Sequence, residues 1–283
     1  MGDTNHSEAA IWKHFTWGVF LDNNRINAEV SYIRNTLWDA KLLDRDWLAT
    51  HEMREWENKT QEFVSNQLSY LQEGRKHAAL EGLLGKLSDY SLTLKEAVAF
   101  FQRNSVSMDY LRKATRDEQA TNKLLGDMTV TPKYTQNPQK IHGIGLTKAI
   151  LWLHACGLAQ DFCPPSRQIY NFIDQDLRNI SYMQSKQQDN GDWYYIGMMR
   201  QFHNTEIKPS IPSATTRDTG VAIWYWKIGQ GLLKRKREAL NLQRFLDYLD
   251  AREIGLLKFA SSVDNIDEVD DLARDVSIFV ASA

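Results

Sequence analysis

Cysteine is scarce in this chain of 283 residues, which contains only Cys156 and Cys163. Two cysteines are too few for a disulfide framework, and they cannot supply the four thiolates that an iron–sulfur cluster needs. A chain without a disulfide framework suits a reducing compartment, so we expect a cytoplasmic protein. The first seven residues are polar and lack the basic and apolar regions of a secretion signal, in agreement with that expectation.

Long apolar runs and an excess of charge are also missing. No run of 18 apolar residues occurs, so we expect no membrane partner. The net charge of −2 does not by itself indicate a nucleic-acid-binding protein. Locally the balance differs, because residues 133–186 hold six basic and three acidic side chains, which leaves +3. No histidine, cysteine or carboxylate cluster has metal-ligand spacing, so we expect neither a metal nor a cofactor.

The spacing of apolar residues predicts an all-α fold. They recur every three or four residues, which is typical of amphipathic helices, and no long stretch alternates with period two as strands do. Asn23–Arg25 predicts one helix start, and the capping-box spacing of Thr93 and Glu96 predicts another. In the first half we expect helices at residues 9–20, 26–37, 45–74, 77–86, 93–103 and 107–125.

An irregular segment at residues 127–141, which contains Pro132 and Pro138, divides the helical pattern. We therefore expect two helical lobes with a cleft, 1–126 and 127–283, either as two domains or as one integrated domain. The second lobe contains a polar loop at 205–217. Its predicted helices cover residues 146–157, 166–173, 193–202, 219–226 and 232–248, with Ser166 as a helix cap.

Two glycines one residue apart, Gly143 and Gly145, precede one of these helices directly. Glycine adopts the positive φ of a tight turn without strain, and Ile144 between them can point into a core. The helix that follows extends to Gly157, a plausible C-terminal cap. Its first N–H groups lack partners within the helix, and a phosphate is a suitable ligand for such groups.

The sequence Gly143-Ile144-Gly145, with Ala149 in register, resembles the second half of the helix-hairpin-helix element of a superfamily of DNA glycosylases. The match runs from Lys140 to Ile173. The resemblance implies that the hairpin binds the backbone of double-stranded DNA and that a base is flipped out of the duplex. The residues expected to contact DNA are His142, Gly143, Gly145, Thr147, Lys148, Ser166, Arg167, Gln168 and Arg217. The lysine nucleophile of lyase-type members aligns with Thr147, so we expect Lys148 to contact phosphate and the enzyme to be monofunctional.

The same resemblance implies a catalytic aspartate where this chain has Pro164-Pro165-Ser166. Base excision leaves positive charge on the sugar, and a nearby carboxylate stabilises it. Elimination leaves two candidates. Asp218 ranks first, since it lies between a polar loop and a helix start beside Arg217, although capping that helix is an alternative role. Asp161 ranks second, because its loop precedes the vacant position, although it could equally be a surface acid.

Three consecutive aromatic residues, Trp193, Tyr194 and Tyr195, follow a polar turn. They cannot all face one core from a helix, so at least one is exposed or lines a cleft. We expect them to form the base pocket, with ordinary helix packing as the alternative. The basic run Lys234–Arg237 is more typical of a solvated helix face than of a DNA contact.

The resemblance therefore implies a DNA glycosylase that flips and excises a modified base and leaves an abasic site, and we expect it to be a monomer. The vacant aspartate position, the aromatic content of 11% and the loop at 205–217 suit a bulky base. Glucosylated hydroxymethylcytosine of phage DNA is such a base, and its excision would serve antiviral defence. The alternatives are a non-enzymatic helix-hairpin-helix DNA-binding module and a helical interaction protein.

Overall fold

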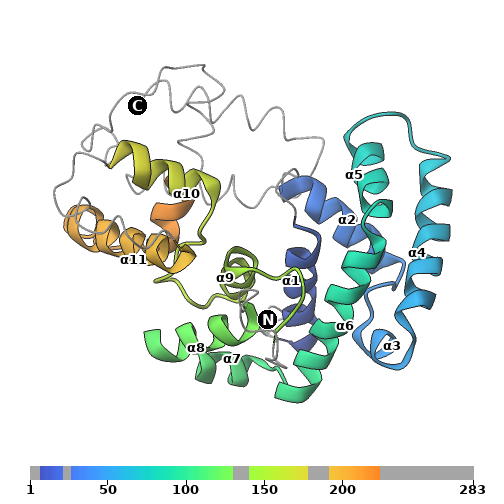
Figure 1. Cartoon of the computed structure of the whole chain (residues 1–283), viewed down its shortest axis with the longest axis horizontal. Helices are drawn as coiled ribbons and strands as arrows, with labels where there is room; N and C mark the ends of the chain where they lie inside the picture. Colours follow the sequence, from blue (N-terminus) through green and yellow to red (C-terminus); the bar gives the residue numbers. More distant parts are fainter. Residues whose placement is uncertain (1–6, 22–26, 130–139, 178–190, 224–283) are drawn as a thin grey trace, which may run out of the picture. The chain divides into compact units, whose positions relative to one another are not determined.

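The computed structural model describes residues 7–21, 27–129, 140–177 and 191–223 (Figure 1). Every regular element in these ranges is helical, which confirms the all-α prediction. Within the same ranges no helix is long and apolar enough to cross a membrane. The described residues form two compact units that divide between Ala159 and Gln160, so the hairpin lies in the N-terminal unit. The predictions for Asn23–Arg25, for Pro132 and Pro138, and for residues beyond 223 fall outside the described residues.

The N-terminal unit contains the first nine α-helices of the structure. These are α1 Glu8–Phe20, α2 Asn27–Asp39, α3 Arg45–Thr50, α4 Met53–Leu68, α5 Arg75–Leu84, α6 Leu87–Asn104, α7 Met108–Ala114, α8 Glu118–Thr129 and α9 Leu146–Ala155. Helix α1 packs against α2, α6 and α9, and α8 also packs against α9 (Figure 1). The helix after the hairpin is therefore held from two sides.

An aromatic cluster forms the centre of this unit. The Phe15 ring lies 5.2 Å from the Phe101 ring and 5.2 Å from the Trp152 ring, measured between centroids, and each pair meets edge to face. Trp12 packs on Phe101 at 5.0 Å. The Trp152 indole N–H donates to the Ile11 carbonyl at 3.2 Å, which satisfies its one buried donor. These contacts join α1, α6 and α9 into one core.

Two long predicted helices are each broken in the structure. The predicted helix at 45–74 divides into α3 and α4, because the His51 ring bonds to the Trp47 carbonyl at 2.8 Å and ends α3. The predicted helix at 107–125 divides into α7 and α8. There the Asp117 side chain accepts the Ala120 N–H at 2.7 Å, as an N-terminal cap does. Local polar side chains thus interrupt an apolar pattern that continues across both breaks.

The predicted capping box at Thr93 and Glu96 is wrong. Both residues lie inside α6, whose first helical residue is Leu87. The Thr93 hydroxyl donates to the Asp89 carbonyl at 2.9 Å, one helical turn earlier. A threonine inside a helix often makes this bond. The Thr93 hydroxyl therefore binds within the helix and does not cap a helix start.

The C-terminal unit contains α10 Arg167–Asn171, the π-helix η2 Phe172–Asp176, α11 Asp192–Phe202, the π-helix η4 His203–Ile207, and helical residues 216–223. The Phe172 and Phe202 rings pack edge to face at 5.4 Å and join η2 to α11. Ser166 accepts the Ile169 N–H at 3.4 Å, which confirms the predicted cap. The predicted polar loop is shorter than expected, because η4 reaches Ile207 and a helix resumes at Thr216.

Candidate nucleic-acid interface

The hairpin is anchored through its two isoleucines. The Ile141 N–H donates to the carbonyl of Met128 in α8 at 3.0 Å, and the Ile144 N–H donates to the Ile141 carbonyl at 3.2 Å. Ile141 and Ile144 are both buried, as predicted for Ile144. Between them Gly143 has a φ of +69°, a conformation that suits glycine. The turn therefore has one fixed shape.

Helix α6 supports the hairpin from the other side. The Glu96 carboxylate accepts a hydrogen bond from the His142 backbone N–H. A side chain at Gly143 would place its Cβ 3.0 Å from the Thr93 hydroxyl oxygen, so the backbone lies close to α6. His142, which we expect to contact DNA, therefore has its backbone N–H bonded to a carboxylate in this structure.

The second hairpin glycine has no internal steric role. Gly145 is the residue that caps the start of α9, with a φ of −91° that any residue adopts. It is exposed, and a Cβ built on it would meet no atom within 4 Å. The first turn of α9 contains no acidic residue. The N-terminus of α9 carries partial positive charge, and the exposed residue before it has no side chain.

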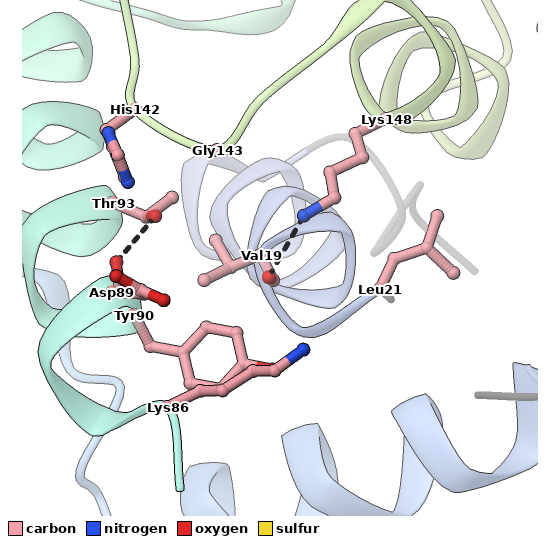
Figure 2. Close-up of a pocket in the computed structure, with 9 residues that line it drawn as sticks. All are labelled: Val19, Leu21, Lys86, Asp89, Tyr90, Thr93, His142, Gly143 and Lys148. Atoms are coloured by element: carbon pink, nitrogen blue, oxygen red, sulfur yellow. Dashed lines mark hydrogen bonds between the residues drawn. The ribbon is translucent and has the colours of Figure 1, made fainter. Parts of the chain in front are cut away.

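Lys148 is half-buried and directed back towards α1. Its ammonium donates to the Val19 carbonyl in the last turn of α1 at 3.4 Å (Figure 2). A cation is favourable at this end of a helix. Thr147, at the position of the superfamily's lysine, is also half-buried. The side chain of Lys148 thus stabilises the crossing of α1 and α9, a role that the sequence pattern alone did not reveal.

Asp218 lies in a capping box of the C-terminal unit. Its carboxylate accepts the Thr215 N–H at 3.0 Å and the Thr215 hydroxyl at 2.9 Å, and its own N–H donates to that hydroxyl oxygen at 3.1 Å. The side chain is buried, with 7% exposed. The reciprocal bonds match the helix-start alternative that the sequence allowed. The carboxylate that ranked first as a catalyst therefore stabilises a helix start.

Asp161 is the more accessible of the two candidate acids. It is exposed, and its backbone carbonyl accepts from the Arg200 side chain at 3.3 Å. The Arg217 N–H donates to the Gln160 carbonyl at 3.0 Å, which ties the helix start of Asp218 to the loop of Asp161. The structure thus brings the loops of both acids together within one compact unit.

His203, a buried histidine at the start of η4, is a further residue of this region that the sequence pattern did not reveal. Its Nδ1 lies 2.9 Å from the hydroxyl oxygen of Thr219, which donates its own proton to the Thr215 carbonyl. With the Thr219 hydroxyl donating to Thr215, the tautomer that has a proton on Nδ1 completes this bond. Burial and then Lys208 lower the pKa of His203, while Asp161 and Asp218 oppose the shift. In the sequence, the predicted polar loop at 205–217 is the feature that lies near His203.

The three predicted base-pocket aromatics have different environments. Tyr195 is buried, and its hydroxyl donates to the Asp174 carboxylate at 3.0 Å. Burial, followed by this bond, raises the pKa of Tyr195 to about 12. Tyr194 is half-buried beside it, and Trp193 is 43% exposed. Of the three, Trp193 is therefore the ring most accessible to a partner.

The remaining predicted contacts lie at the start of α10. Ser166 uses its hydroxyl as the helix cap, Arg167 is exposed, and Gln168 is half-buried. They belong to the C-terminal unit, whereas the hairpin residues belong to the N-terminal unit.

Both cysteines are buried, and burial raises the pKa of Cys156 to about 12 and that of Cys163 further still. Neither thiol is ionised at neutral pH.

Within the described part of the chain, no group of three or more histidine, cysteine or carboxylate side chains is arranged to hold a metal ion.

Comparisons with protein-family models, with characterised proteins and with solved structures find no match to this chain.

Proposed function

We propose that this protein binds double-stranded DNA through the hairpin and acts as a DNA glycosylase on a modified base. Gly145 carries the binding part of the proposal. Neither its φ nor its surroundings require glycine, and with glycine there no side chain lies at the exposed start of α9. Close approach of an external group to the backbone accounts for glycine at such a position. A DNA phosphate is the expected group, because helix N-termini attract anions.

A steric substitution tests this contact without disturbing the fold. Gly145→Ala should leave the melting temperature nearly unchanged, and Gly145→Glu adds a repelling charge. Both should weaken duplex binding, measured by fluorescence anisotropy at low salt. Gly197→Ala is the matched control, because Gly197 is also exposed and its added Cβ also meets nothing within 4 Å. Wild-type affinity in both Gly145 variants would remove the hairpin from the interface.

The excision part of the proposal rests on the resemblance and on the accessible carboxylate of Asp161. Because the Asp218 carboxylate is held by Thr215, Asp161 is the better candidate to face a sugar. Loss of one well-placed electrostatic group typically costs about a hundred- to a thousandfold in rate. We expect Asp161→Asn to lose excision while duplex binding persists. The assay uses duplexes with different modified bases, glucosylated hydroxymethylcytosine included, followed by alkaline cleavage of abasic sites.

A non-enzymatic DNA-binding module is the second candidate. Two observations favour it: Ser166 caps α10 close to where the superfamily has its catalytic aspartate, and the Asp218 carboxylate belongs to a capping box. Such a module binds duplex DNA with the same dependence on Gly145 but releases no base from any substrate. Excision of any base by the wild-type protein, lost in Asp161→Asn, would exclude it.

A further inference from the structure

A pocket of about 270 Å³ lies beside the hairpin in the N-terminal unit (Figure 2). It is lined by Val19, Leu21, Lys86, Asp89, Tyr90, Thr93, His142, Gly143 and Lys148. Its volume is at the small end for ligand pockets, which suits one chemical group better than a whole cofactor.

Basic side chains reach the pocket from three separate elements. Lys86 precedes α6, His142 belongs to the hairpin, and Lys148 lies in the first turn of α9. Figure 2 shows the two lysines entering from different walls. The Lys148 ammonium donates to the Val19 carbonyl at the border of the pocket. The only acidic lining residue is Asp89, so even with neutral histidine the lining carries a net positive charge.

The backbone adds to this preference. The N-terminal turns of α6 and α9 both border the pocket, and each carries partial positive charge. The last turn of α1 also borders the pocket, and this end of a helix carries partial negative charge. There the Lys148 ammonium binds the Val19 carbonyl. Two positive helix ends, two ammonium groups and an imidazole together favour an anion.

We propose that this pocket binds a phosphate group, and that in the complex with DNA this group is a backbone phosphate next to the hairpin. The assignment to DNA rests on the proposed function, whereas the assignment to phosphate does not. Lys86 is the residue that distinguishes this contact from the one at Gly145, because it lies immediately before α6 and outside the hairpin.

The first arm of the test uses inorganic phosphate against the intact protein at fixed ionic strength, with chloride as the reference anion. We expect the backbone amide NMR signals of Thr93 and Gly143 to shift in a saturable way. Lys86→Ala should weaken this binding several-fold, and Asp89→Asn should strengthen it by removing a repelling charge. Lys95→Ala is the matched control, since Lys95 is an exposed lysine of α6 that does not line the pocket.

The second arm measures duplex affinity against salt concentration. Each neutralised phosphate contributes about 0.9 to the slope of log affinity against log salt, so Lys86→Ala should lower the slope by about that amount. Phosphate binding with an unchanged slope would overturn the DNA source and assign the pocket to a free phosphate ester. Phosphate binding without any duplex binding would overturn the proposed function and leave the pocket's ligand standing. No saturable phosphate shift together with an unchanged slope would overturn the inference itself.

Discussion

The Glu96 carboxylate accepts a hydrogen bond from the His142 backbone N–H, and the two residues are 46 positions apart in the chain. This contact fastens the hairpin to α6 and fixes the turn that precedes α9. It also places a negative charge beside the backbone that we expect to meet phosphate. Glu96 therefore both orders the hairpin and opposes DNA binding by charge.

Glu96→Gln separates these two effects, because the amide oxygen still accepts the hydrogen bond but carries no charge. We expect duplex binding to tighten about threefold at low salt, which corresponds to the roughly 0.2–1 kcal/mol of a charge pair near the surface. Glu96→Ala should instead weaken binding, since the hairpin loses its support. Glu62→Gln, which removes one exposed charge from α4, is the control for net charge. Equal affinities for Glu96→Gln and Glu96→Ala would contradict the ordering role.

The periodicity of apolar residues predicted helices α1, α2 and α9 well. Ile33 and Leu37 are fully buried on one face of α2, and the cap at Ser166 is present. The capping box at Thr93 and Glu96 failed because α6 already begins at Leu87. Glu96 makes a tertiary contact with His142 instead, which local spacing cannot reveal. Tertiary neighbours likewise decide the direction of the Lys148 side chain.

The Thr215–Asp218 capping box could be predicted from the sequence, because a threonine followed by an acid three residues later is a local pattern. Helix capping is one of the two roles that the sequence leaves open for Asp218, beside its place as the first candidate for the catalytic acid. The burial of His203 could not be predicted from the sequence. It depends on the packing of η4 against the following helix, which contains Thr219.

Replacement of Asp218 should cost stability, whereas replacement of Asp161 should not. Asp218→Ala breaks the reciprocal bonds with Thr215, and loss of a helix cap typically costs about 0.5–2 kcal/mol. Asp161 is exposed in a loop, so Asp161→Ala should change the free energy of unfolding little. Urea denaturation of the two variants at neutral pH measures both effects. Equal stability of Asp218→Ala and the wild type would show that the capping box contributes nothing.

Gly220 and Cys163 approach each other so closely that no side chain fits between them. A Cβ on Gly220 would lie 2.4 Å from the Cys163 sulfur and 3.5 Å from its Cβ. Gly220→Ala should therefore destabilise the protein by about 1–3 kcal/mol, as overpacking does in a filled core. Cys163→Ala removes the sulfur and leaves an ordinary contact. The double variant should recover part of the loss, and additive effects in the double-mutant cycle would refute the contact.

His203 should make the stability of the protein depend on pH. Burial lowers the pKa of its imidazole below the ordinary value near 6.5, Lys208 lowers it further, and Asp161 and Asp218 offset part of the shift. Because the unfolded chain binds a proton more readily than the folded one, this contribution is complete above about pH 6.5 and is lost as the pH falls towards the folded-state pKa.

His203→Asn keeps a side-chain N–H that can donate to Thr219 but removes the titrating ring. We expect the free energy of unfolding of the wild type to fall between about pH 7 and pH 5, by at most about 1.4 kcal/mol per pH unit for this one proton. The variant should show a shallower fall. Some pH dependence should remain, because burial also lowers the pKa of His14. His14→Asn is the matched control, and removal of either histidine should reduce the slope independently, since the two belong to different compact units. An unchanged slope in His203→Asn would mean that the buried imidazole takes up its proton as easily in the folded protein as in the unfolded chain.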